Sequence, residues 1–242
     1  MPMPRVSGVS SVGGTLGYNK KNIEELRDVI NTTAQECGKK VADILNKEII
    51  VPMSNAWFAT EAVNYFASFK KDVAKSGVNI KNTFEKFKSN IELAGKDWAE
   101  RTKNEVPQLA QLDDVEVIVD VSSIQKEDNT GTAKIIVDDA NRIANNLENV
   151  EKNIQQELKN ISTKLDASTS FVGGNQSQSI QSFFTELCGE IHKIFSFLSG
   201  SNGYADTSLK ENINNAAKYY GDLATNISKA FNDAAPSNAS TQ

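Results

Sequence analysis

An apolar stripe of unusual length constrains what this chain of 242 residues can fold into. Its residues follow one another at steps of three, four or seven, apart from a first step of five: Trp57, Ala62, Phe66, Phe69, Val73, Ile80, Phe84, Phe87, Ile91, Ala94 and Trp98. Side chains at this spacing lie on one face of an α-helix. A helix of about 45 residues is on the order of 70 Å long, so the stripe predicts an elongated helical protein.

Helical spacing returns in three other stretches: residues 22–48, 136–165 and 180–227, the last with a break at 199–203. The first helix is expected to end before Pro52, because the residue before a proline disfavours the α conformation. Ser54 is the expected N-cap of the long second helix. A single hairpin leaves an apolar face that it cannot bury alone. The sequence therefore predicts an all-α fold, in which two antiparallel helical hairpins form an elongated four-helix bundle.

The segment between the two hairpins departs from helical spacing. Valines occupy alternate positions from Val115 to Val121, as in a β-strand. Residues 126–131 are rich in turn formers, and residues 132–137 are suited to a second short strand. Two interpretations stay open, a small β-hairpin within residues 114–137 or an extended linker whose valines cover one end of the bundle.

These patterns divide the chain into five parts. They are a flexible N-terminal arm (1–19), a first helical hairpin (20–103), a linker or small β element (104–133), a second helical hairpin (134–232) and a disordered tail (233–242).

Composition restricts the classes of function. The chain carries 26 Lys and Arg against 31 Asp and Glu, and this acidic balance argues against nucleic-acid binding, which needs a basic face. The single histidine, His192, does not share a helix face with Glu190, and no nucleophile is spaced to pair with a base. We therefore expect no enzyme activity, no cofactor and no metal site. Cys37 and Cys188 are expected to be buried thiols, with a disulfide between the hairpins as the open alternative.

Membrane and export signals are weak in this sequence. The first residues lack the apolar core of about 7–15 residues that a secretory signal carries. No window approaches the roughly 18 apolar residues of a membrane-spanning helix. We therefore expect no stable membrane span, and either a cytoplasmic location or export by a machine that reads no cleaved signal.

An internal repeat relates the two hairpins. A shift of 114 residues takes Trp57 onto Phe171 and Ala59 onto Gly173, and it aligns apolar positions of the following helices without a gap. Each copy reads as a helix, a turn of the form aromatic-x-small, and a second helix. In such a turn the small residue lets two backbones approach and the aromatic side chain fills the end of the core. We interpret Trp57 and Ala59 mainly as this kind of packing element.

The segment Asn55–Phe66, with the sequence NAWFATEAVNYF, resembles the signature of the WXG family, the early-secreted-antigen-like substrates of type VII secretion. Phe171-Val-Gly173 is similar to a degenerate second copy. Ala59 stands where the family has glycine, and Phe171 where it has a second tryptophan. The family's C-terminal export motif, Tyr-x-x-x-Asp/Glu, is absent, and the nearest approach is Tyr219 with Asp222.

This resemblance implies a tandem, fused pair of WXG-like units. Such a protein would be non-enzymatic and exported by, or serving, a type VII secretion system, without a cleaved signal peptide. It would act by protein–protein recognition of a secretion ATPase or a co-exported protein. We expect a monomer whose hairpins pair within the chain, with a domain-swapped or end-to-end dimer as the alternative.

Two other function classes stay open from the sequence. One is a membrane-active helical pore-former or translocator, with Val115–Val121 or Phe195–Leu198 as its apolar trigger. The other is an intracellular helical scaffold with no export. The sequence names no effector or host target.

Overall fold

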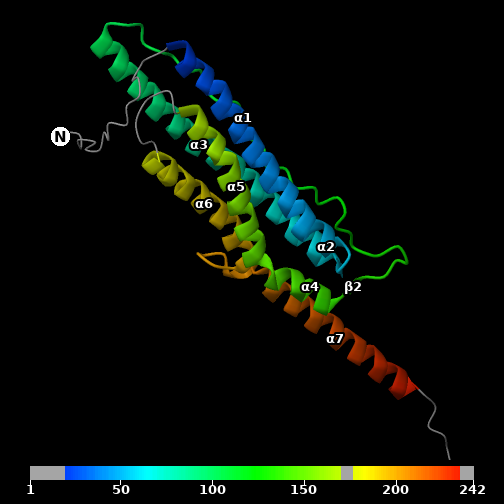
Figure 1. Cartoon of the computed structure of the whole chain (residues 1–242). Helices are drawn as coiled ribbons and strands as arrows, with labels where there is room; N and C mark the ends of the chain where they lie inside the picture. Colours follow the sequence, from blue (N-terminus) through cyan, green and yellow to red (C-terminus); the bar gives the residue numbers. More distant parts are fainter. Residues whose placement is uncertain (1–19, 170–176, 235–242) are drawn as a thin grey trace, which may run out of the picture.

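A computed structural model describes residues 20–169 and 177–234 of the chain (Figure 1). Of the described residues, 76% are helical, and the strands form one two-stranded sheet. The expectation of a mostly helical fold is therefore confirmed. The predicted arm (1–19) and most of the predicted tail (235–242) lie outside the described residues.

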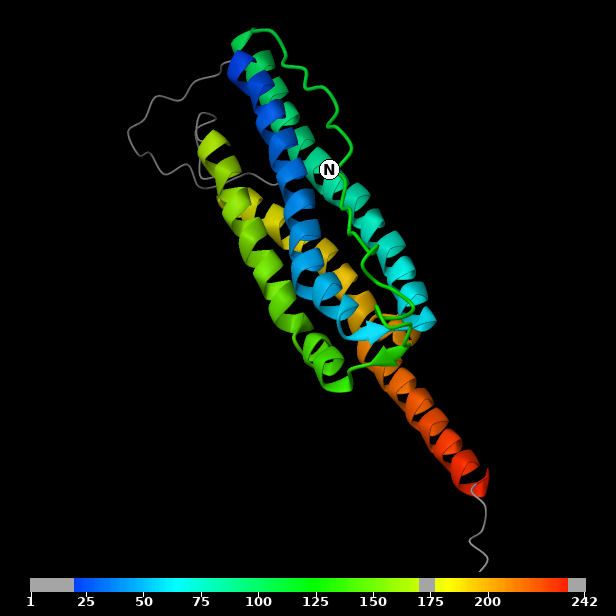
Figure 2. The ribbon, with the colours of Figure 1, turned by 90° about the vertical axis from the view of Figure 1, so that its right-hand side faces the viewer.

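Four long helices make up the body of the molecule: α1 (Lys20–Leu45), α3 (Thr60–Thr102), α5 (Leu147–Thr169) and α6 (Ser177–Ser199). They lie side by side, with α1 and α6 each contacting both α3 and α5 (Figures 1 and 2). The largest fully buried side chains of these helices include Ile30, Leu45, Phe66, Phe69, Phe84, Ile154 and Leu158. The long apolar stripe of α3 thus faces the core up to Phe87, beyond which Ile91 and Trp98 are half-buried and Ala94 is exposed.

The sequence predicted that helical structure would stop before Pro52, but it continues through this residue, although α1 itself ends at Leu45. A π-helix (Asn46–Ile50) and the short helix α2 (Val51–Ser54) follow α1 directly, and Pro52 lies in the first turn of α2. Proline is tolerated at that position because its missing N–H falls where a new helical segment begins. Ser54 does not cap α3 either, since its hydroxyl donates to the Val51 carbonyl at 2.8 Å and α3 begins at Thr60.

Of the two interpretations left open for residues 114–137, the β-hairpin is wrong. Strand β2 (Lys134–Ile135) pairs antiparallel with β1 (Trp57–Phe58), the turn after α2, so that Trp57 lies opposite Ile135. Residues 104–124, which we call the strap, have no helix or strand and run along α1 and α3 (Figure 2). The interpretation as an extended linker is closer to the structure. The strap's valines, however, cover the side of the helices and not one end of the bundle.

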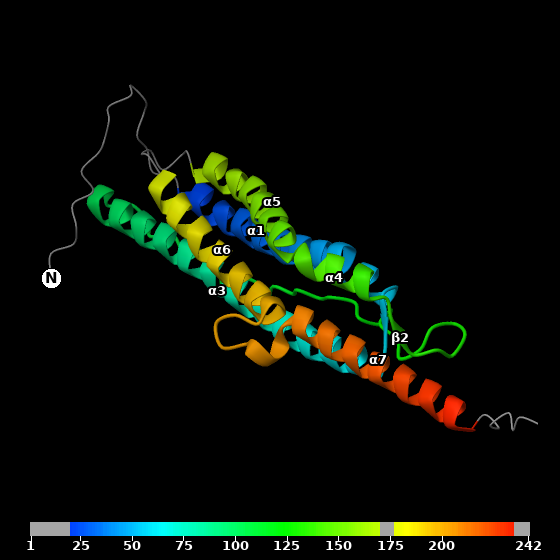
Figure 3. The same ribbon diagram turned by 90° about the horizontal axis from the view of Figure 1, so that it is seen from below.

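The last helix, α7 (Leu209–Ala234), leaves the body of the molecule. Its first half packs against α4 (Val137–Asn145) and β2, after a short 3₁₀ turn at Ala205–Thr207. Its second half extends past the other helices, as all three views of the ribbon show (Figures 1, 2 and 3).

Candidate functional site

The turn that carries the aromatic motif is buried. Trp57 is 1% exposed, and the centroid of its ring lies 6.3 Å from that of Tyr65. Ala59 is fully buried, and its N–H donates to the Gln125 carbonyl at 3.2 Å. With φ −163° and ψ 156°, Ala59 has extended backbone that does not require glycine. The structure thus places both residues inside the body, where they contact the connecting segment.

The other residues singled out in the sequence are not brought to this turn. Phe171 and Gly173 lie outside the described residues. Tyr219 and Asp222 are exposed on α7, where the ring of Tyr219 packs edge-on against that of Tyr220.

The strap is held by helix side chains that bind its backbone. From α1, the Gln35 amide donates to the Asp114 carbonyl at 2.8 Å, and from α3, Lys88 Nζ donates to the Ala110 carbonyl at 3.0 Å. Glu85 accepts the Leu112 N–H and lies 2.9 Å from Lys88. Burial alone would raise the pKa of Glu85, but the hydrogen bonds from Lys88 and Leu112 lower it. Side chains therefore supply the partners that a neighbouring strand would otherwise give.

Three glycines allow the strap to lie close to the helices. A Cβ added at Gly38 would stand 2.7 Å from the Glu116 carbonyl oxygen, and one at Gly95 would stand 2.7 Å from Pro107. A Cβ at Gly77 would overlap the Val115 carbonyl oxygen. At the same level Val115, Val117 and Val119 are buried. The strap is thus a packed part of the body.

One cluster of reactive groups was missed in the sequence because its members come from two helices. His192 Nδ1 lies 2.9 Å from a carboxylate oxygen of Glu151, and Cys188 is one helical turn before His192. The structure places no hydrogen bond between His192 and the Cys188 thiol. Burial, with a smaller contribution from the Glu151 charge, raises the pKa of Cys188 to about 11. The thiol is therefore protonated at neutral pH and is a poor nucleophile. Both Cys37 and Cys188 are present as thiols.

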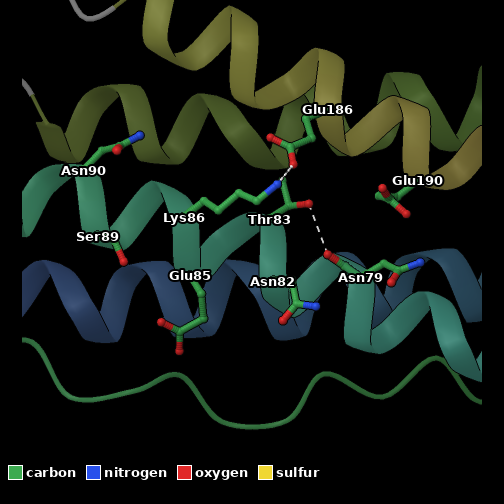
Figure 4. Close-up of a pocket in the computed structure, with 9 residues that line it drawn as sticks. All are labelled: Asn79, Asn82, Thr83, Glu85, Lys86, Ser89, Asn90, Glu186 and Glu190. Carbon is green, nitrogen blue, oxygen red and sulfur yellow. Dashed lines mark hydrogen bonds and ion pairs between the residues drawn. The ribbon is translucent and has the colours of Figure 1, made fainter. Parts of the chain in front are cut away.

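A polar hollow of about 570 Å³ lies between α3 and α6 (Figure 4). It is lined by amides, hydroxyls and charged groups: Asn79, Asn82, Thr83, Glu85, Lys86, Ser89, Asn90, Glu186 and Glu190. Lys86 forms an ion pair with Glu186, and the Thr83 hydroxyl donates to the Asn79 carbonyl at 3.1 Å. Small-molecule sites are mostly apolar with a few polar groups. None of these lining residues has an apolar side chain, and the hollow offers no nucleophile paired with a base.

The projecting half of α7 presents an apolar face with no partner in the described structure. Leu223 is 42% exposed, Ile227 48% and Phe231 74%, and every residue from Gly221 to Phe231 is exposed. The same stripe starts at Leu209, Ile213 and Ala216, which are buried against the body. A cluster of exposed large apolar side chains on one helix face commonly marks an interaction site. We take this face, residues 219–231 of α7, as the candidate functional site and call it the α7 face.

Sequence reasoning found the stripe of this last helix but not its exposure. Periodicity identifies the apolar side of a helix, but it does not reveal where the neighbouring elements stop. Phe231 was missed altogether, although its step of four from Ile227 continues the pattern.

Two other kinds of site have no candidate within the described ranges. In residues 20–169 and 177–234, no group of His, Cys, Asp and Glu side chains gathers as ligands for a metal ion. No helix of that part of the chain combines the length and apolarity needed to cross a membrane.

Comparison with known proteins corrects the resemblance to the WXG family. Residues 10–205 match the family described as Pox virus Ag35 surface protein, which is not a WXG or type VII secretion family. No curated protein and no solved structure matches the chain. The WXG resemblance rested on a short turn motif, and core packing alone accounts for its residues, since Trp57 and Ala59 are buried. With most of its length matched, the chain belongs to the Pox virus Ag35 surface protein family.

Proposed function

We propose that this chain is a non-enzymatic protein that acts by protein–protein recognition, with the α7 face as the recognition element. Its two hairpins pair within the chain as a four-helix bundle that carries α7. The observation that supports this proposal is the row of exposed apolar side chains at Leu223, Ile227 and Phe231 on a helix that leaves the body. A helical segment shorter than about 12–15 residues is marginal in water without tertiary contacts, so this segment gains stability from a partner.

A location outside the cytoplasm forms part of this proposal. The matched family is described as a surface protein of pox viruses. We extend that location to this chain, because an apolar helix face displayed at a surface is available to other proteins.

Recognition fits the chemistry of the site better than catalysis does. The Cys188 thiol is protonated at neutral pH. In the polar hollow, Lys86 and Glu186 form an ion pair with each other. Most apolar side chains of the segments considered as membrane triggers are covered, since Val117, Val119 and Phe197 are buried, and Ile118 is a single exposed residue among them at 59%. The α7 face is the exposed apolar element to test, because its large apolar side chains, Leu223, Ile227 and Phe231, follow one another on one helix.

A photo-crosslinking amino acid at Phe231 of the full chain tests this function in cells that produce the protein. We expect the crosslinker to join the chain to a protein, because residue 231 lies on the exposed face. The matched control places the crosslinker at Thr225, on the opposite side of α7, where we expect at least fivefold less adduct. Equal adduct at both positions, or adduct with lipid alone, would overturn the proposal.

A further inference from the structure

The α7 face continues a packing surface that the chain already uses. From Ile213 onward the apolar residues step by three and four: Ile213, Ala216, Tyr220, Leu223, Ile227 and Ala230. This alternation is the spacing at which two helices pack side by side over several turns. The first two residues are buried where α7 contacts α4, and Tyr220 is half-buried at the edge of the body. The stripe therefore runs on past the point where its partner within the chain ends.

The order of side chains on the α7 face is nearly the same in both directions. Counted from Thr225, Leu223 and Ile227 stand at two residues, Tyr220 and Ala230 at five, and Tyr219 and Phe231 at six. Aliphatic residues thus flank the centre, and aromatic residues stand at both ends. A face with this symmetry is complementary to itself when two copies run antiparallel about a two-fold axis, as symmetric dimers require. Leu223 then meets Ile227 of the second copy, and Tyr219 meets Phe231.

Charge does not oppose such a pairing. Between residues 219 and 231 the charged residues are Asp222 and Lys229, one of each sign, and both lie on the side of the helix away from the stripe. Within residues 219–231, two copies can therefore approach without bringing like charges together. The antiparallel arrangement also keeps the two bodies at opposite ends of the pair, because each α7 projects away from its own body (Figure 3).

Residues 235–242 are a poor alternative occupant of the α7 face. Residues 235–242, Ala-Pro-Ser-Asn-Ala-Ser-Thr-Gln, contain no large apolar side chain that would cover Leu223 or Ile227. At the base of the α7 face, by contrast, Ile136 and Val137 at the start of α4 are 41% and 36% exposed. The end of a second copy's helix would reach this region and extend the apolar contact.

We propose that the α7 face is the contact between two copies of this chain, joined end to end through antiparallel α7 helices. This inference rests on the proposed function and names its partner. It revises the expectation of a monomer but keeps the pairing of the hairpins within one chain. Two short helices bury less area than a standard interface, so we expect a dissociation constant on the order of 1–100 μM.

Sedimentation equilibrium of the full chain between about 1 and 200 μM tests the dimer. We expect a concentration-dependent rise from 26.4 kDa toward twice that mass. Ile227→Glu should weaken association at least tenfold, because it places a charge in the middle of the contact. Thr225→Glu is the matched control, since it adds the same residue within one helical turn on the opposite side, and it should leave association within about twofold. Both variants should keep the circular dichroism spectrum of the wild type, because both positions lie outside the core.

Disulfide trapping tests the orientation. A Tyr219→Cys chain mixed with a Phe231→Cys chain should form a disulfide between the two new cysteines, assigned by mass spectrometry. A Phe231→Cys chain alone should form no disulfide between two copies of residue 231, which antiparallel helices hold roughly 18 Å apart along the axis. The reverse result would overturn the antiparallel arrangement.

The outcomes separate this inference from the proposed function. A wild-type chain that stays monomeric at 200 μM, or an Ile227→Glu chain that still dimerises, overturns the α7 contact. If the crosslinker at residue 231 then captures a different protein, the recognition function stands without the dimer. If it captures residues 1–19 of the same chain, the α7 face is covered from within, and both proposals fail.

Discussion

Replacing Gly77 by alanine is expected to destabilise the folded chain by about 1–3 kcal/mol, the usual cost of overpacking. The added methyl group would overlap the Val115 carbonyl oxygen, so the strap would have to move away from α3. Alanine is otherwise the better helix former by about 0.5–1 kcal/mol. A loss of stability would therefore show that the strap lies close to Gly77, whereas a gain would show that it does not. Urea unfolding followed by far-UV circular dichroism measures it.

Gly189→Ala supplies the matched control for that experiment. Gly189 also lies inside a long helix, α6, but a Cβ built there meets no atom within 4 Å beyond its chain neighbours and the backbone of its own helix. The same substitution should therefore stabilise the chain by about 0.5–1 kcal/mol. If both variants were stabilised, the strap would not lie against Gly77, and our description of residues 104–124 would be wrong.

Trp57→Ala is expected to cost about 3–5 kcal/mol, the range for removing a large aromatic side chain from a core. Trp57 is 1% exposed, and it packs beside Tyr65 and across from Ile135 in the small sheet. Its loss would open a cavity where the turn after α2 meets the second half of the chain. Urea midpoints of the wild type and the variant give the difference in the free energy of unfolding.

The second of the chain's two tryptophans provides the comparison. Trp98 is half-buried near the end of α3, so Trp98→Ala should cost less than about 2 kcal/mol. A Trp57→Ala chain with an unchanged midpoint would show that Trp57 serves recognition and not packing.

Helical spacing in the sequence was enough to predict the helical class and the position of the long helices. The stripe from Trp57 to Phe87 is buried as expected, because residues at that spacing share one face whatever they pack against. The sequence prediction missed that helical structure continues through Pro52 after α1 ends at Leu45. The preference of the residue before proline is local, and here a π-helix (Asn46–Ile50) leads directly into α2, whose first turn contains Pro52.

The strap shows what periodicity does not supply. Alternate valines indicate an extended backbone with one apolar side, and that much holds for Val115, Val117 and Val119. They do not say whether the hydrogen-bond partners are another strand or side chains such as Gln35 and Lys88. Gly38 and Gly77 could have indicated where the strap packs, since a glycine inside a helix often marks a place where another segment approaches its backbone closely.

The candidate site was the part least accessible to sequence reasoning. The stripe of α7 was found, but a stripe that is buried by its own chain and one that awaits a partner have the same spacing. Only the positions of α4 and β2 show that the apolar stripe of α7 is buried by the rest of the chain no further than Tyr220. The cluster of Glu151, Cys188 and His192 was missed for a similar reason, because its members lie on helices that are distant in the sequence.

Hydrogen exchange along α7 tests most directly the central claim that a second copy covers the α7 face. Amides in an uncovered helical segment of this length exchange quickly. We predict that amides of residues 220–231 exchange at least tenfold more slowly at 200 μM than at 1 μM full-length protein. In the Ile227→Glu chain they should exchange quickly at both concentrations, with exchange in α1 and α3 unchanged. Exchange that is equally fast at both concentrations in the wild type, or equally slow in the Ile227→Glu chain, would contradict the account.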